Sequence, residues 1–306
     1  MTNSVISSAN NNRTIAGKTI SRIGLGCVTF GREIDEQASF AMMNYAVSNG
    51  IRFFDTAAAY VNGASEIIVG RWLRKHPEIR ERMTLATKIL PPFNADSIER
   101  SVDECLKRLQ AKTIDLLYLH RWDTTLQKNS LHALNDLIER KKVSMLGASN
   151  FTTKQLSDTL QLQAQNNFTP FQFVQNNHNL AVSDVPNEFK EICLQHKINI
   201  ITYSPLGAGF LTGKHTGGVQ AGTRFDLIPG HQDVYFNDTA YSRLKKLQKV
   251  AARTGHTSSH LALAWALHQP DVASVLIGGR TTAHIDQAIA ALAFDDPEVF
   301  SELENT

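Results

Sequence analysis

The chain has little excess charge of either sign. Lys and Arg total 31, and Asp and Glu total 29, among 306 residues. A protein whose main partner is a nucleic acid or an acidic membrane surface generally carries a strong basic field, which this near balance does not provide. We therefore expect a small-molecule ligand, with no nucleic-acid or membrane partner. The sequence does not indicate an oligomeric state.

Cysteines and long apolar runs are also scarce. Cys27, Cys105 and Cys193 are odd in number and widely spaced, whereas a disulfide framework or a zinc ribbon needs paired spacings. The segment Met1–Asn12 is polar and lacks the apolar core of a secretory signal, and the apolar run Leu261–Leu267 is too short to span a bilayer. These features favour a cytoplasmic protein that is neither exported nor embedded in a membrane.

Two common phosphate-binding motifs are absent. A Rossmann fingerprint that began at Gly24-Leu25-Gly26 would need a glycine at position 29, where the chain has Thr29. A Walker loop that ended at Gly213-Lys214 would need glycine at 208 and Ser or Thr at 215, where the chain has Ala208 and His215. Any dinucleotide must therefore be bound in another way.

Motifs for hydrolysis and metal binding are missing as well. No Gly-x-Ser-x-Gly elbow occurs, so a serine hydrolase has no support. His256 and His260 have the spacing of two ligands on one helix face, but no glutamate lies between them and no third ligand is evident. We therefore expect surface histidines there and no metal site.

Short apolar runs alternate with amphipathic segments along the chain. In 96–110, for example, apolar residues recur at the spacing of one buried helix face. Strands that alternate with helices indicate a parallel sheet. The eight strand candidates are Ile23–Gly26, Arg52–Phe54, Thr84–Thr87, Asp115–Leu119, Val143–Ala148, Phe171–Val174, Asn199–Thr202 and Ala273–Ile277.

Polar residues follow seven of these runs, most of them spaced by about 30 residues, the length of one βα unit. They are Asp55, Lys88, His120, Ser149, Gln175, Tyr203 and Gly279. In an eight-stranded barrel such positions meet at the carboxyl-end mouth, where active sites of this fold lie. We expect a (β/α)8 TIM barrel that forms a single domain over residues 13–306, after a polar tail over 1–12.

The last interval, between Tyr203 and Gly279, is too long for one βα unit. It contains a Gly-rich loop, Leu206–Gly230, and helix candidates over Thr239–Thr254 and Thr257–His268. We expect this inserted loop and helix to lie over the mouth. A hairpin over Thr14–Arg22, turning at Ala16-Gly17-Lys18, is expected to close the opposite end of the barrel.

Four of the residues at the mouth can carry acid–base chemistry. Tyr60 shares a loop with Asp55, and Lys88 and His120 follow the next two strands. A phenol is a weak catalyst near neutral pH, but an adjacent ammonium stabilises the phenolate and lowers its pKa. Asp55 would hold Lys88, while His120 would orient a carbonyl oxygen or assist proton transfer. The set suits protonation of an oxyanion.

Each of these residues also has an ordinary structural interpretation. A loop tyrosine usually packs, a lysine after a strand is usually solvated, and Asp-Thr commonly begins a helix. Taken singly, these interpretations prevail. Four such side chains at the ends of consecutive βα units favour catalysis instead.

The sequence resembles the aldo-keto reductase family from Arg22 onward. The motifs that carry this resemblance are Gly24-Leu25-Gly26, Phe54-Asp55-Thr56-Ala57 with Tyr60, Gly63-Ala64-Ser65-Glu66, Ala86-Thr87-Lys88, Leu119-His120-Arg121-Trp122-Asp123, Gly147-Ala148-Ser149-Asn150, Gln175 and Tyr203-Ser204-Pro205-Leu206. The resemblance implies a catalytic tetrad of Asp55, Tyr60, Lys88 and His120. Tyr60 would be the general acid in reduction and the general base in oxidation, and the usual cofactor is NADP(H).

The resemblance also implies residues that hold the nicotinamide. Ser149, Asn150 and Gln175 match positions that bind its carboxamide, and Tyr203 matches the ring that stacks on it. A hydroxyl and two amides suit a carboxamide, and an aromatic ring fixes the exposed face. The alternative is a set of strand-end caps and a barrel-rim aromatic residue.

Two further segments match cofactor-binding positions. Gly26 and Cys27 resemble residues beside the nicotinamide ribose, although Cys27 is equally suited to be a small buried filler. The segment 204–214, with Ser204, Leu206 and Gly209, resembles the family's pyrophosphate loop, where glycines let backbone N–H groups approach phosphate oxygens.

The segment after the last strand matches the family's adenosine 2′-phosphate site. Gly279, Arg280, Thr281 and His284 offer a guanidinium, a hydroxyl and an imidazole, which suit a phosphate better than a ribose hydroxyl. A solvated helix start is the alternative. The family often has Gln at 284 and Glu-Asn at 287–288, where this chain has Gln287-Ala288. We expect NADP(H), with NAD(H) the less favoured cofactor.

Three functions are compatible with these residues. The leading one is an NADP(H)-dependent oxidoreductase that reduces an aldehyde or ketone, or oxidises the alcohol. The second is a regulatory NADP-binding subunit of the potassium-channel β type, and the third is an epimerase or eliminase that uses transient oxidation of a sugar. Side chains such as Phe30, Trp122 and those of 206–237 are expected to set specificity, but the sequence does not identify the substrate.

Overall fold

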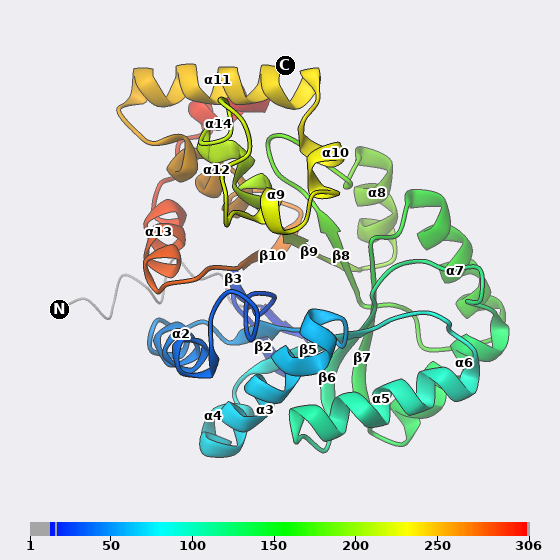
Figure 1. The fold of residues 1–306 in the computed structure, drawn as a ribbon. Coiled ribbons are helices and arrows are strands. Elements are labelled where there is room, and N and C mark those ends of the chain that lie inside the picture. The colour runs from blue at the N-terminus through cyan, green and yellow to red at the C-terminus, as the bar shows by residue number, and fades with distance from the viewer. Residues whose placement is uncertain (1–12, 16, 305–306) are drawn as a thin grey trace.

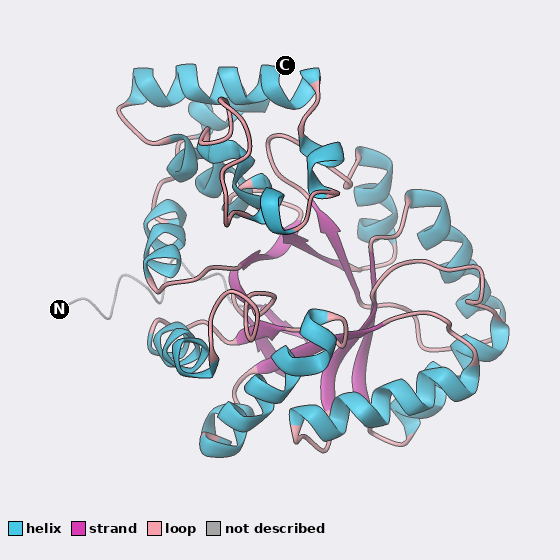
Figure 2. Ribbon diagram, in the orientation of Figure 1, coloured by secondary structure: helices cyan, strands magenta, loops and turns pink. Residues whose placement is uncertain are grey.

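Eight parallel strands form a closed barrel in the computed structural model, which describes residues 13–15 and 17–304. Figure 1 and Figure 2 show the strands at the centre with helices around them. Going round the barrel, the order is β10-β3-β4-β5-β6-β7-β8-β9. Their bounds are β3 Ile23–Gly26, β4 Phe53–Asp55, β5 Thr84–Ile89, β6 Ile114–Leu119, β7 Val143–Ser149, β8 Phe173–Asn177, β9 Asn199–Tyr203 and β10 Val272–Ile277. The expected barrel is confirmed.

Helices alternate with the strands in sequence. They are α2 Glu36–Ser48, η1 Tyr60–Gly63, α3 Ala64–Lys75, α4 Pro77–Arg80, α5 Ala95–Leu109, α6 Lys128–Glu139, α7 Thr153–Gln165, α8 Asn187–Gln195, η2 Gly207–Thr212, α9 Arg224–Leu227, α10 His231–Tyr235, α11 Asp238–Thr254, α12 Ser258–Leu267, α13 Ala283–Leu292 and α14 Pro297–Glu304. The amphipathic segment expected over 96–110 is α5, whose first turn is capped by the side chain of Asn94.

The strands are apolar because both of their faces are covered. One face packs against the helices, and the other fills the barrel with a second cluster that includes Phe53, Leu116, Tyr118 and Phe173. A barrel of this size is a packed core rather than a pore.

The amino-terminal hairpin closes one end of the barrel. β1 (Arg13–Ile15) pairs antiparallel with β2 (Lys18–Ile20). Ile20 is buried in the interior cluster, and the Thr84 hydroxyl donates to the carbonyl of Thr19 over 3.0 Å. The hairpin is confirmed, but its turn residue Ala16 and the expected tail over 1–12 lie outside the described residues.

The structure corrects two details of the expected layout. The polar residues expected beyond five strands belong to them: Asp55, Ser149 and Tyr203 are the last residues of β4, β7 and β9, and Lys88 and Gln175 lie within β5 and β8. Lys88 and Gln175 can lie inside a strand because other polar groups satisfy their buried side chains. In the long interval before β10, Thr223, Arg224 and His231 line the cleft at the mouth. The long helix α11 does not lie there; it packs against α12 and α14 at the periphery (Figure 1).

The described helices also bear on membrane insertion. Within residues 13–15 and 17–304, none combines the length and apolar character that crossing a bilayer requires.

Helices α3 and α5 approach each other closely at Gly70. A Cβ at this position would lie 2.6 Å from the carbonyl carbon of Leu109, which is backbone and cannot rotate away. The glycine thus sets how closely the two helices pack behind β4 and β5.

We predict that Gly70→Ala destabilises the fold by about 1–3 kcal/mol through overpacking. Gly217→Ala is the matched control, since a Cβ there meets nothing within 4 Å. Urea unfolding of both variants measures the difference. Equal stability of the two variants would contradict the close approach of α3 and α5.

Candidate active site

A cleft of about 520 Å³ opens at the carboxyl end of the barrel. Most of the residues expected at the site line it. They are Gly26, Asp55, Tyr60, His120, Ser149, Asn150, Gln175, Tyr203, Ser204, Leu206, Gly209, Gly279, Arg280 and His284. The fold therefore brings together side chains from distant parts of the chain, as the strand-end positions predict.

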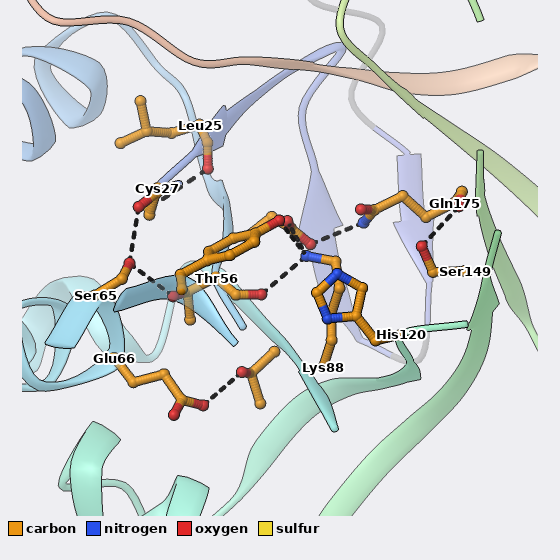
Figure 3. Close-up of polar contacts among 12 residues, drawn as sticks. Leu25, Cys27, Thr56, Ser65, Glu66, Lys88, His120, Ser149 and Gln175 are labelled. Carbon is orange, nitrogen blue, oxygen red and sulfur yellow. Dashed lines mark hydrogen bonds and ion pairs between the residues drawn. The ribbon is translucent and has the colours of Figure 1, made fainter. Parts of the chain in front are cut away.

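Lys88 lies behind the cleft wall and joins three groups. Its Nζ donates to a carboxylate oxygen of Asp55, to the carbonyl of Thr56 over 2.9 Å and to the hydroxyl of Tyr60 over 3.3 Å. Figure 3 marks the hydrogen bond from the lysine to Thr56. All three ammonium protons are thereby used, although Lys88 is 1% exposed.

Asp55 is held from two sides. One of its carboxylate oxygens accepts from Lys88 and the other accepts from Nε2 of Gln175 over 2.8 Å. Burial raises the pKa of Asp55, and Lys88 and Gln175 oppose that effect. Burial alone would lower the pKa of Lys88, but Asp55 and Tyr60 raise it. Because both groups are hydrogen-bonded in their charged forms, we describe them as an ion pair.

Tyr60 remains a neutral phenol. Burial raises its pKa, and the nearby Lys88 only partly offsets this. Lys88 lowers the pKa of Tyr60, as expected, but the net pKa is raised because desolvation of the phenolate outweighs its attraction to the ammonium. Since the Tyr60 oxygen accepts from Lys88, its own O–H is available to a group in the cleft.

His120 is also neutral. Burial, then Lys88 and Arg121, lower its pKa to about 3. Its ring lies edge-on to Tyr60, with centroids 5.9 Å apart, and its Nδ1 has no hydrogen-bond partner among the described residues. An uncharged imidazole beside a phenol can orient an oxygen by hydrogen bonding rather than by charge.

Two buried side chains, Ser65 and Glu66, fix the loop that carries Tyr60. Ser65 Oγ contacts Thr56 Oγ1 at 2.8 Å and donates to the carbonyl of Cys27, also at 2.8 Å. The buried carboxylate of Glu66 accepts from Thr87 and Arg108, each at 2.6 Å. Ser65 and Glu66, from the motif Gly63-Ala64-Ser65-Glu66, therefore anchor the loop and do not line the cleft.

The residues expected to hold a carboxamide already contact one another. Ser149 Oγ donates to the carbonyl of Gln175 over 2.8 Å, as Figure 3 shows. Asn150 Nδ2 donates to the carbonyl of His120 over 2.8 Å, and the hydroxyl of Tyr203 donates to Asn150 Oδ1 over 2.6 Å. These bonds fix the side chains at the cleft wall before any ligand is considered.

The glycine-rich loop after β9 places a cation beside a glycine of positive φ. Gly209 has φ of 97°, and Lys214 approaches it, since a Cβ on Gly209 would lie 3.4 Å from the lysine Nζ. A side chain at 209 would therefore displace the cation. Lys214 lines the cleft but was not among the expected contacts.

Arg280 reaches across the mouth to the inserted loop. Its Nη2 donates to the carbonyl of Gly222 over 2.9 Å. His284 packs beneath Gly279, where a Cβ would lie 2.8 Å from the histidine ring, and Thr281 Oγ1 is 3.1 Å from His284 Nδ1. Thr281 itself does not line the cleft.

Other expected positions also fall outside the lining. Cys27 and Phe30 are fully buried, so their side chains act as core fillers. Trp122 is exposed and is not in the lining either. Burial raises the pKa of the Cys27 thiol, which keeps it protonated and apolar.

Glu33 escaped the sequence analysis, and Arg224 was expected only as one member of the range 206–237. Arg224 lies 3.9 Å from Glu33, which also pairs with Arg32 over 2.6 Å. These residues belong to segments far apart in the chain, so no local pattern could pair them. The only available signal was the length of the interval that contains Arg224.

Comparison with known proteins agrees with this geometry. A model of the Aldo/keto reductase family matches residues 22–305. "Probable aldo-keto reductase 1" from Glycine max is 31% identical over 299 residues, covering 90% of this chain and 82% of that protein. "Uncharacterized oxidoreductase YrpG" from Bacillus subtilis is 28% identical over 311 residues, covering 94% and 93%. "Probable voltage-gated potassium channel subunit beta" from Arabidopsis thaliana is 28% identical over 296 residues, covering 90% and 89%.

We predict that Lys88→Met destabilises the protein by about 3–5 kcal/mol near neutral pH, because Asp55 is left as a buried, unpaired charge. In the variant, the folded-state pKa of Asp55 lies further above the pKa of this group in the unfolded chain. A carboxyl group with a raised folded-state pKa destabilises the fold once it ionises, so the free energy of unfolding falls as pH rises. The variant should therefore be more stable, relative to the wild type, at about pH 5 than at about pH 8.

Chemical denaturation at the two pH values measures this effect. The double variant Asp55→Asn/Lys88→Met is the control, since it removes the carboxylate and should lose the added pH dependence. A single variant whose stability follows that of the wild type at both pH values would contradict the ion pair.

Proposed function

Since the chain belongs to the aldo/keto reductase family, we propose that it is an NADP(H)-dependent oxidoreductase that reduces an aldehyde or ketone, or oxidises the corresponding alcohol. The observation that carries this proposal is the grouping of Tyr60, Lys88, Asp55 and His120 at one wall of the cleft. Its substrate is a small carbonyl or alcohol.

Tyr60 supplies the proton in this proposal. Its oxygen accepts from Lys88, which leaves the O–H to donate to a carbonyl oxygen. As that oxygen gains negative charge, the proton moves to it and the Lys88 ammonium stabilises the charge left on the phenol. Neutral His120 orients the same oxygen. The nicotinamide supplies the hydride when bound.

The donor set of the cleft fits a dinucleotide. Ser149, Asn150 and Gln175 suit the carboxamide, and Tyr203 provides a ring beside them. Gly209 and Lys214 suit a pyrophosphate, since a glycine lets a ligand approach the backbone closely and a cation attracts a phosphate. We assign the remaining cofactor positions, from Gly26 to His284, on the family resemblance.

NADP(H) is favoured over NAD(H) by the Arg280 guanidinium and the neighbouring His284 imidazole in the cleft lining. A guanidinium matches a phosphate group. We place the protein in the cytoplasm, which is consistent with its three free, buried cysteines.

A regulatory NADP-binding subunit is the second candidate. The similarity to a probable potassium channel subunit beta favours it. Turnover of a generic aldehyde by the purified protein separates the two, because a purely regulatory subunit would bind the cofactor without consuming it.

We predict that Tyr60→Phe keeps cofactor binding but loses most carbonyl reduction, roughly 10²-fold or more, because the ring remains and the proton is gone. NADPH oxidation with a carbonyl panel measures the loss, and a cofactor titration is its control. Near-normal turnover would exclude Tyr60 as the acid.

We predict that Arg280→Ala weakens NADPH binding far more than NADH binding. Losing a charge-assisted contact typically costs about 1.5–3 kcal/mol, and exposure of Arg280 favours the lower end. Titration of both cofactors against wild type and variant measures the difference. Equal losses for NADH and NADPH would mean that Arg280 does not bind the 2′-phosphate.

A further inference from the structure

Tyr118 is a buried phenol in the barrel interior, on the strand next to that of Lys88. In the barrel register it pairs with Lys88 of β5 on one side and Gly147 of β7 on the other. The Lys88 ammonium lies 6.0 Å from the centre of its ring. Tyr118 therefore occupies the same layer of the barrel as the lysine.

Gly147 gives the Tyr118 ring its direction. A Cβ on Gly147 would lie 2.6 Å from two ring carbons, so the ring extends over this glycine. Gly147 pairs in turn with Phe173 of β8, two residues before Gln175. The phenol thus runs from β6 toward the strand that carries Gln175.

The Tyr118 hydroxyl has no hydrogen-bond partner among the described residues, although Tyr118 is fully buried. Burial, followed by Asp55, raises its pKa well above the usual value, while the nearby Gln175 side chain acts in the opposite direction. The phenol therefore stays protonated, and the register places it beside Lys88, the partner of Asp55, with its ring extending toward the strand of Gln175. A buried donor without a partner is unusual and calls for a physical reason.

Gln175 provides that reason because it is expected to serve two groups. Its Nε2 donates to Asp55 in the structure, and the proposed function also has its amide holding a nicotinamide carboxamide. If the amide turns, one oxygen of the buried Asp55 carboxylate loses its donor. That loss is costly unless another donor replaces it.

We propose that Tyr118 is a positioning residue whose hydroxyl donates to Asp55 when the Gln175 amide turns toward a bound carboxamide. This inference rests on the proposed function. The exchange keeps Asp55 fully hydrogen-bonded and so holds Lys88 in place against Tyr60. Tyr118 acts through Asp55 and does not touch the substrate.

Tyr118→Phe tests the exchange because it removes only the hydroxyl. No hydrogen bond is lost without cofactor, so urea unfolding of the free protein should match the wild type. The dissociation constant for NADP(H) should rise by about tenfold, as for a lost bond to a charged group. Thr202→Val is the matched control, since Thr202 has another buried hydroxyl without a partner among the described residues; its affinity should not change.

The pH dependence of binding provides a second measurement. The titratable groups around Asp55 are Lys88, Tyr60, Tyr118 and Cys27. With its donor lost, Asp55 in the bound variant should favour its protonated form, so binding should weaken further as pH rises. Equal affinities and pH profiles for wild type and Tyr118→Phe would overturn the proposal. A wild type that binds neither NADP(H) nor NAD(H) would instead overturn the proposed function and this inference with it.

Discussion

The buried ammonium of Lys88 is the group on which the site depends. A cation in the barrel interior is stable only when its desolvation is offset, and here a carboxylate, a carbonyl and a phenol share that task. The same three bonds fix the strand end that carries Asp55 and the loop that carries Tyr60. One charge therefore stabilises a local fold and sets the position of the proton donor.

Much of the fold could be predicted from the sequence because βα units repeat an apolar pattern. The errors in the strand boundaries occur where buried polar residues interrupt that pattern. The strand expected over Thr84–Thr87 continues to Ile89. The polar residue Lys88 was expected to end the strand, but its ion pair with Asp55 allows it to be buried within it. Likewise, the strand expected over Phe171–Val174 is displaced into the polar sequence that begins at Gln175.

The sequence could predict which residues lie at the carboxyl-end mouth, because each follows a predicted strand, but it could not predict how they interact there. Position along the chain locates Tyr60 but does not show that burial outweighs Lys88 in setting its pKa. The pairing of Arg224 with Glu33 depends on how a long loop folds across the cleft, which no local pattern encodes. Tyr118 reads as an ordinary strand aromatic until the register places it beside the lysine.

The hairpin at the amino end and the packed barrel interior leave the carboxyl-end mouth as the side from which the cleft is reached. Ile20 is buried in the interior cluster, so the amino end is packed with side chains. Molecules and protons that reach Tyr60 must come and go through the carboxyl-end mouth.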